Sequence, residues 1–175
     1  MPELLCHPTT PCTAISSVKV ELTPHGDNSL TLTWIVTGDI EQISLPADAP
    51  AVHTDELWKT TCFECFIRDG NNPGYREFNL APSGAWAAYD FDAYRAGMRA
   101  FALSEIPDIV VNKSGYHLAL AATLPAVALP PAPTLAITAV VALQDGSKTY
   151  WSLQHADGKP DFHHQDGFVL PLDAA

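Results

Sequence analysis

Short stretches in which hydrophobic and polar residues alternate fill most of the chain. In LTLTWIVTG (30–38), the alternation places Leu30, Leu32 and Trp34 on one side of an extended strand. SVKVELT, which precedes it, shows the same period of two, and PHGDNS between them is typical of a hairpin turn. TLAITAVVALQ and KTYWSLQH, on either side of a DGS turn, predict a second hairpin.

Further strands are expected at IEQISLP, CFECFI, YREFNLAP, AWAAYDFD, YHLALAATL and GFVLPL. Nine or ten short strands separated by turn signals predict an all-β fold of two antiparallel sheets, a β-sandwich of the immunoglobulin or jelly-roll type. Only DAYRAGMRAFAL (92–103) has helical spacing, and it predicts one short helix. We therefore expect less than about a fifth of the chain to be helical.

The length of 175 residues suits a single domain with a sizeable core. We expect a Pro-rich leader over residues 1–14 and one domain over 15–175, since no internal repeat or linker divides the rest. Strands and helices do not alternate along the chain, which disfavours a nucleotide-binding α/β fold.

Composition narrows the function classes. Hydrophobic residues make up 47% and charged residues 17%, which excludes a disordered chain. The net charge of −11 disfavours nucleic acid and anionic membrane as partners. No stretch approaches the roughly 20 apolar residues of a membrane span, and the N-terminus lacks the features of a signal peptide. A cytoplasmic protein is therefore expected.

The motif CFEC superficially suggests a redox or zinc-binding pair. In a strand, however, positions three apart lie on opposite faces, so Cys62 and Cys65 cannot bind one metal together. We expect both to be reduced, buried, structural thiols.

Charged residues interrupt the predicted strand YREFNL, so neither of its faces is purely apolar. If this strand pairs with CFECFI across the loop RDGNNPG, Glu64 and Glu77 become neighbours on one sheet face. Such a carboxyl pair could act as acid and base, because one of the two would have a raised pKa. Alternatively, each glutamate pairs with Arg68, Arg76 or Lys59 as structural support.

Three tryptophans outside the predicted core strand are candidates for ligand stacking. Trp58 and Trp151 lie among polar residues, and Trp86 follows the PSG turn. An indole with an apolar body and a polar edge suits stacking on a sugar ring or another flat ligand. The alternative is that each ring fills the core, which is the interpretation we adopt for Trp34.

Signals for metal binding are weak. His163 and His164 are adjacent, so at most one faces a given site, and a zinc site needs three or four converging ligands. Asp90 and Asp92 could bind calcium together with backbone carbonyls. The chain lacks HExxH, zinc-finger spacing, a Gly-rich phosphate loop and a GxSxG elbow.

The blocks LWKTTCFECFI, YREFNLAPSGAWAAYDFDAYR, YWSLQH and GKPDFHHQDGF resemble the bacterial DOMON-like family, which is related to the family 9 carbohydrate-binding modules. The resemblance covers roughly residues 15 to 172 and implies a β-sandwich of two antiparallel sheets. Members of this wider superfamily bind sugars or haem. In the carbohydrate-binding modules, two tryptophans sandwich a terminal sugar, and charged and amide side chains bind its hydroxyls.

Transferred to this chain, the resemblance implies a stacking pair formed by Trp58 and Trp151. It implies Glu64, Arg76 and Glu77 as the groups that bind hydroxyls. The complete set of candidate ligand-binding residues is Trp58, Glu64, Arg76, Glu77, Asn79, Trp86, Trp151 and His163.

The sequence is compatible with three alternative functions. The first is a non-catalytic module that binds a small molecule, a saccharide or glycan fragment. The second is a module for non-covalent haem, with Met98 and either His163 or His117 as axial ligands, since no CxxCH attachment motif is present. The third is a hydrolase or lyase that uses Glu64 and Glu77.

Overall fold

The computed structural model describes residues 1–172, and within them the chain is all-β, with 47% strand and no α-helix. The prediction of little helix is thus confirmed. The strands are β1 (Glu3–Cys6), β2 (Ile15–Pro24), β3 (Leu30–Gly38), β4 (Cys62–Asp69), β5 (Tyr75–Leu80), β6 (Trp86–Phe91), β7 (Arg99–Ala100), β8 (Asp108–Lys113), β9 (His117–Leu124), β10 (Pro133–Ala142), β11 (Lys148–Ser152) and β12 (Leu170–Pro171). Four 3₁₀ turns join them: η1 (Ile40–Gln42), η2 (Leu57–Lys59), η3 (Ala126–Ala128) and η4 (Gln165–Gly167).

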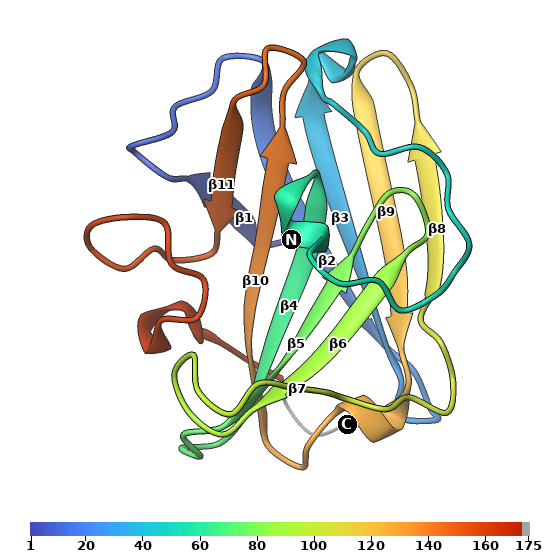
Figure 1. Ribbon diagram of the computed structural model, residues 1–175, viewed down its shortest axis with the longest axis vertical. Helices are drawn as coiled ribbons and strands as arrows, with labels where there is room; N and C mark the ends of the chain where they lie inside the picture. Colours follow the sequence, from blue (N-terminus) through green and yellow to red (C-terminus); the bar gives the residue numbers. More distant parts are fainter. Residues whose placement is uncertain (173–175) are drawn as a thin grey trace.

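All twelve strands belong to one curled antiparallel sheet (Figure 1). Its order is β7-β6-β5-β4-β10-β11-β1-β2-β3-β9-β8, with β12 beside β10. The expected division into two separate sheets is therefore wrong, because β1 pairs with β11 on one side and with β2 on the other. Residues 1–14, expected as a leader, supply this connecting strand.

The hydrophobic core lies inside the curl. Side chains at alternating positions of β3 are fully buried, and Trp34 from β3 packs against Phe63 from β4 with ring centroids 5.7 Å apart. This contact joins the two halves of the sheet across the core. Burial of each such side chain stabilises the fold by about 1.5–3 kcal/mol.

The two predicted hairpins are confirmed, since β2 pairs with β3 and β10 with β11. The helix predicted over 92–103 is wrong. Arg95 and Gly97 have φ angles of 52° and 69°, which are incompatible with a right-handed helix, and the segment forms a tight loop that leads into β7. A Cβ atom on Gly97 would also collide with the side chain of Asp92, so the positive φ and the close packing of this position both favour glycine.

The predicted strand at IEQISLP is also wrong. Residues 40–42 form η1, and Ile43 makes only an isolated bridge to Leu143. Three strands were not predicted, namely β1, β7 and β8. No helix in the part of the chain described is both long and apolar enough to cross a membrane.

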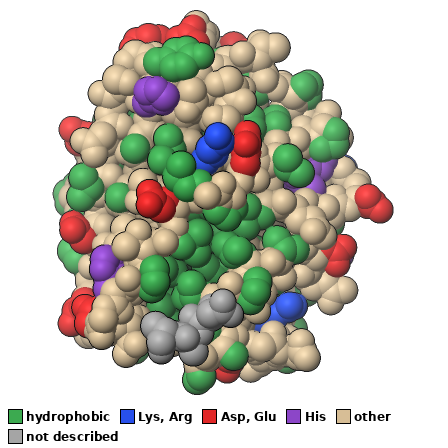
Figure 2. All heavy atoms as spheres, turned by 180° about the vertical axis from the view of Figure 1, so that it is seen from behind, with side chains coloured by type: hydrophobic (Ala, Val, Ile, Leu, Met, Phe, Trp, Pro, Cys, Tyr) green, Lys and Arg blue, Asp and Glu red, His purple; other side chains and the backbone are tan. Residues whose placement is uncertain are grey.

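The surface is predominantly acidic, in line with the net charge of −11. Seen from the side opposite to Figure 1, Asp and Glu side chains are spread over the face, whereas Lys and Arg are few (Figure 2). Such a charge distribution produces a negative potential around the molecule.

Candidate ligand-binding site

The outer face of the curled sheet carries a second group of buried side chains, separate from the core. Along β4, Phe63, Cys65 and Ile67 point into the core, so the residues between them point outward. The strand register places Phe66 opposite Glu77 on β5, and Glu77 opposite Tyr89 on β6. Side chains from five strands, β4, β5, β6, β10 and β11, therefore share this outer face.

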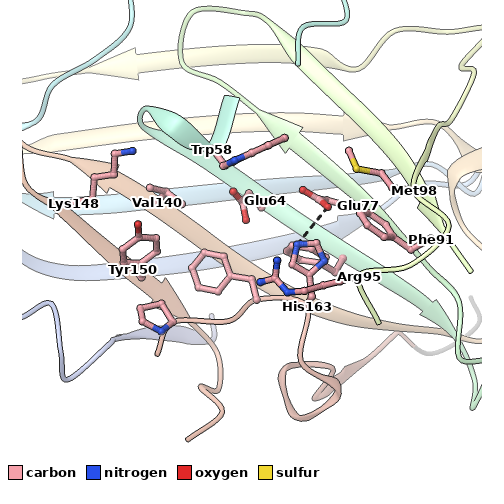
Figure 3. Close-up of a pocket in the computed structure, with 13 residues that line it drawn as sticks. Trp58, Glu64, Glu77, Phe91, Arg95, Met98, Val140, Lys148, Tyr150 and His163 are labelled. Atoms are coloured by element: carbon pink, nitrogen blue, oxygen red, sulfur yellow. Dashed lines mark ion pairs between the residues drawn. The ribbon is translucent and has the colours of Figure 1, made fainter. Parts of the chain in front are cut away.

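A cavity of about 410 Å³ opens on this face (Figure 3). The sheet forms its floor, while the 92–98 loop, the segment that follows β11 and the turn η2 form its rim. It is lined by Trp58, Glu64, Phe66, Glu77, Phe91, Arg95, Met98, Val140, Lys148, Tyr150, Pro160, Phe162 and His163.

Glu77 lies on the floor of the cavity and is only 4% exposed. Its Oε1 accepts a hydrogen bond from Asn79 Nδ2 at 2.7 Å, and its Oε2 lies 3.9 Å from His163 Nε2. Burial raises the pKa of this carboxyl to about 7, against an ordinary value of 4.5.

Glu64 is diagonal to Glu77 across the β4–β5 pair, because Asn79 lies directly opposite Glu64. It is 3% exposed, and its Oε2 accepts a hydrogen bond from Thr138 Oγ1 at 3.2 Å. Burial, followed by the charge of Glu77, raises the pKa of Glu64 well above its ordinary value. The two glutamates are thus neighbours on one sheet face, as predicted.

His163 reaches the cavity from the segment after β11. Its Nδ1 is 2.7 Å from the Tyr75 hydroxyl, and its ring packs edge-on against Phe66 and Phe91. Burial, followed by the charge of Arg95, lowers the pKa of His163 to about 4, so the imidazole is neutral near neutral pH.

The rim is held together by a small polar network between two loops. Arg95 Nη2 donates to Asp161 Oδ1 at 2.8 Å, and the Tyr94 hydroxyl donates to the other oxygen of Asp161. The backbone N–H of Arg95 donates to the Tyr75 hydroxyl at 3.2 Å. Tyr75 therefore connects the 92–98 loop to His163 in the other loop.

Trp58 is the partly exposed aromatic of the site. It lies in η2, is 36% exposed, and packs edge-on against Tyr89 with centroids 6.4 Å apart. Tyr89 in turn donates a hydrogen bond to Asp55. In Figure 3, the indole extends beside the carboxyl groups of Glu64 and Glu77, with one ring face turned to the cavity.

Four of the eight predicted residues line the cavity, namely Trp58, Glu64, Glu77 and His163. A fifth, Asn79, lies beneath it as the hydrogen-bond donor to Glu77.

The remaining three predicted residues do not face the cavity. Trp151 and Trp86 are 5% and 6% exposed and belong to the core, because their positions on β11 and β6 point inward. The proposed stacking pair of Trp58 and Trp151 is therefore wrong. Arg76 forms a two-bond ion pair with Asp90 and covers the ring of Phe101 at 3.3 Å, away from the cavity.

Several lining residues were missed in the sequence. Lys148 and Tyr150 alternate with Trp151 along KTYWS, so a correct assignment of Trp151 to the core would have placed both on the outer face. The sequence did not indicate that Arg95 lines the cavity, because residues 92–103 were expected to form a helix.

Cys62 and Cys65 lie on opposite faces of β4, and both are buried and unlinked, as predicted.

The calcium hypothesis finds little support at Asp90 and Asp92, because these carboxylates form ion pairs with Arg76 and Arg99. Among residues 1–172, no group of three or more His, Cys, Asp or Glu side chains is arranged to hold a metal ion.

The residues considered for haem are divided by the fold. Met98 and His163 line the same cavity, whereas His117 lies on β9, where its ring contacts Thr37 and Tyr116 in the other half of the sheet.

No protein-family model matches the chain, and no curated protein is significantly similar to it in sequence. Among solved structures, the chain is similar to that of a protein from Bacteroides uniformis that is named a "putative carbohydrate-binding protein". The TM-score is 0.65 at 15% sequence identity, and the match covers 89% of this chain and 77% of the other. At this identity, the likeness establishes a shared fold.

Proposed function

We propose that the protein is a saccharide-binding module and that its ligand occupies the cavity on the outer face of β4, β5, β6, β10 and β11. The observation that carries this proposal is that a partly exposed indole and two buried carboxyl groups line one cavity of about 410 Å³. The name given to the structurally similar protein supports the same class of ligand, as does the resemblance to the DOMON-like family.

Each wall of the cavity has a separate task in this proposal. The C–H-rich face of a sugar ring stacks on Trp58, since an indole offers a broad apolar surface. Hydroxyl groups donate to Glu77 Oε2 and to the Glu64 carboxyl, neither of which is saturated by protein donors in residues 1–172. Lys148 and Arg95, at opposite ends of the cavity, donate to further hydroxyls (Figure 3).

The decisive experiment is a glycan array followed by isothermal titration calorimetry with the best ligands. We expect saturable binding that is weakened in Trp58→Ala and unchanged in Trp34→Phe, a conservative change in the core. Failure of every saccharide to bind would refute the proposal. Reducing-end release, followed in the same samples, tests the alternative that Glu64 and Glu77 act as a catalytic pair.

Non-covalent haem is the second candidate, because Met98 and His163 share the cavity. His163 is neutral near neutral pH, as an iron ligand must be, but its Nε2 faces Glu77. Titration of the purified protein with haemin, followed by visible absorption, decides this point. A shifted Soret band that disappears in Met98→Leu and His163→Gln would favour haem over a sugar.

A further inference from the structure

The two carboxyl groups of the cavity lack a permanent cationic partner. Within the described residues, no Lys, Arg or His nitrogen lies within ion-pair distance of Glu64, and Glu77 has only the neutral His163 at 3.9 Å. Both side chains are nonetheless more than nine-tenths buried. An ionised carboxyl group is costly to bury without a compensating cation, so a cation that enters the cavity stabilises the ionised form of both glutamates.

Neither of the two cations that line the cavity forms an ion pair with Glu64 or Glu77. The charge of Arg95 acts on Glu77 from a distance and opposes the rise in its pKa, but the guanidinium is paired with Asp161 at 2.8 Å. Lys148 lies opposite Ala142, at the far end of β10 from the Arg95 side, and is drawn well apart from Glu77 in Figure 3. The groups that surround the carboxyl pair on its other sides are acidic or neutral: Cys62, Asn79, Thr138, Tyr89 and its partner Asp55.

The walls of the cavity also favour a cation. Five aromatic side chains line it, contributed by η2, three strands and the segment after β11: Trp58, Phe66, Phe91, Tyr150 and Phe162. The faces of such rings carry partial negative charge and attract ammonium groups. The net charge of −11 extends this preference beyond the cavity, since it attracts cations over long range.

We infer that the saccharide recognised by this cavity carries a free amino group, and that its ammonium binds between Glu64 and Glu77, whose carboxyl groups release their protons to solvent as it binds. This inference rests on the proposed saccharide-binding function and narrows it to amino sugars. An ammonium group has three donors, which match the unsaturated oxygens of two diagonal carboxyl groups. Trp58 then stacks on the sugar ring that carries the amine.

Three disaccharides with the same β-1,4 linkage test the inference: the glucosamine dimer, its di-N-acetyl form and cellobiose, which differ only at C2. Isothermal titration calorimetry at pH 7 should show that the glucosamine dimer binds at least about tenfold more tightly than the other two, the ratio typical of one charge-assisted hydrogen bond. The variants Glu64→Gln and Glu77→Gln should weaken binding of the glucosamine dimer far more than binding of cellobiose, which reduces this ratio to near one. Glu21→Gln, an exposed change on β2 that removes the same charge, is the matched control and should keep the ratio.

The possible outcomes distinguish a failure of this inference from a failure of the proposed saccharide-binding function. If cellobiose or the acetylated dimer binds as tightly as the amine, the inference is overturned and saccharide binding stands. The inference is equally overturned if the glutamine variants keep the preference for the amine. If none of the three sugars binds and the glycan array is also blank, both proposals are refuted.

Discussion

The imidazole of His163 lies 3.9 Å from the carboxyl of Glu77, and each of the two groups is buried in its neutral form. Burial moves their pKa values in opposite directions, to about 7 for Glu77 and to about 4 for His163. As the pH rises, Glu77 therefore lowers the free energy of unfolding and His163 raises it.

The first prediction separates these two effects. Folded protein keeps the Glu77 proton up to about pH 7 while the unfolded chain releases it near 4.5, so this group lowers stability as the pH rises between those values. His163 binds its proton near 6.5 when unfolded and near 4 when folded, so it raises stability with pH over that range. Partial cancellation is expected in the wild-type protein.

Glu77→Gln removes the first effect and leaves the second. From pH 4.5 to pH 8, the variant should gain stability relative to the wild-type protein by roughly 3 kcal/mol, the linkage value of a shift of this size. Urea unfolding at several pH values measures this difference. Glu21→Gln should show no such trend, and a difference that stays constant with pH would contradict the assignment of Glu77 as a buried, neutral acid.

The second prediction contrasts two tryptophans. Trp151→Ala should lower the free energy of unfolding by about 3–5 kcal/mol, because it empties a position in the core. Trp58→Ala should leave the melting temperature nearly unchanged, because its ring is 36% exposed, but should weaken saccharide binding by about 1–2 kcal/mol. Thermal melts and calorimetry on both variants check this contrast. Equal destabilisation by both changes would mean that Trp58 is structural.

The third prediction concerns Tyr75, whose hydroxyl contacts both His163 Nδ1 and the backbone N–H of Arg95. Tyr75→Phe keeps the ring, which stacks on Phe91 at 4.8 Å, but removes both hydrogen bonds. We expect faster amide hydrogen exchange in residues 92–98 and 158–165, and little change in β3 or β10. Tyr116→Phe, at an exposed tyrosine, is the control. Unchanged exchange in both loops would show that the hydroxyl does not hold the rim together.

Much of this fold could be predicted because side chains alternate between core and surface along most strands. The position of Trp34 in LTLTWIVTG and the separation of Cys62 from Cys65 both follow from that period of two. The single continuous sheet could not be predicted, because it depends on β1, a strand of four residues in a Pro-rich segment. Strands this short carry too little pattern to be recognised.

The site was predicted only in part, for a related reason. Glu64 and Glu77 stood out as charges within apolar strands, and their pairing follows from the β4–β5 hairpin. The assignment of Trp151 failed because alternation alone does not say which face of a strand is the core when both faces are largely buried. On β11 the core face carries Trp151, and the ligand face carries Lys148 and Tyr150.

The last prediction uses the four cysteines, which differ in accessibility rather than in bonding. Cys62 and Cys65 are fully buried, and burial raises the pKa of both thiols, so neither should form a reactive thiolate in the folded protein. Cys6 and Cys12 are only partly buried and should react with a thiol reagent under native conditions. We therefore expect up to two thiols to react slowly in native protein and all four in denatured protein.

Rapid native labelling at Cys62 or Cys65, identified by peptide mass mapping, would mean that β4 is not held in the sheet as described. A Cys6→Ser, Cys12→Ser double variant is the control, since it should show almost no native labelling and the same labelling of the two β4 thiols after denaturation.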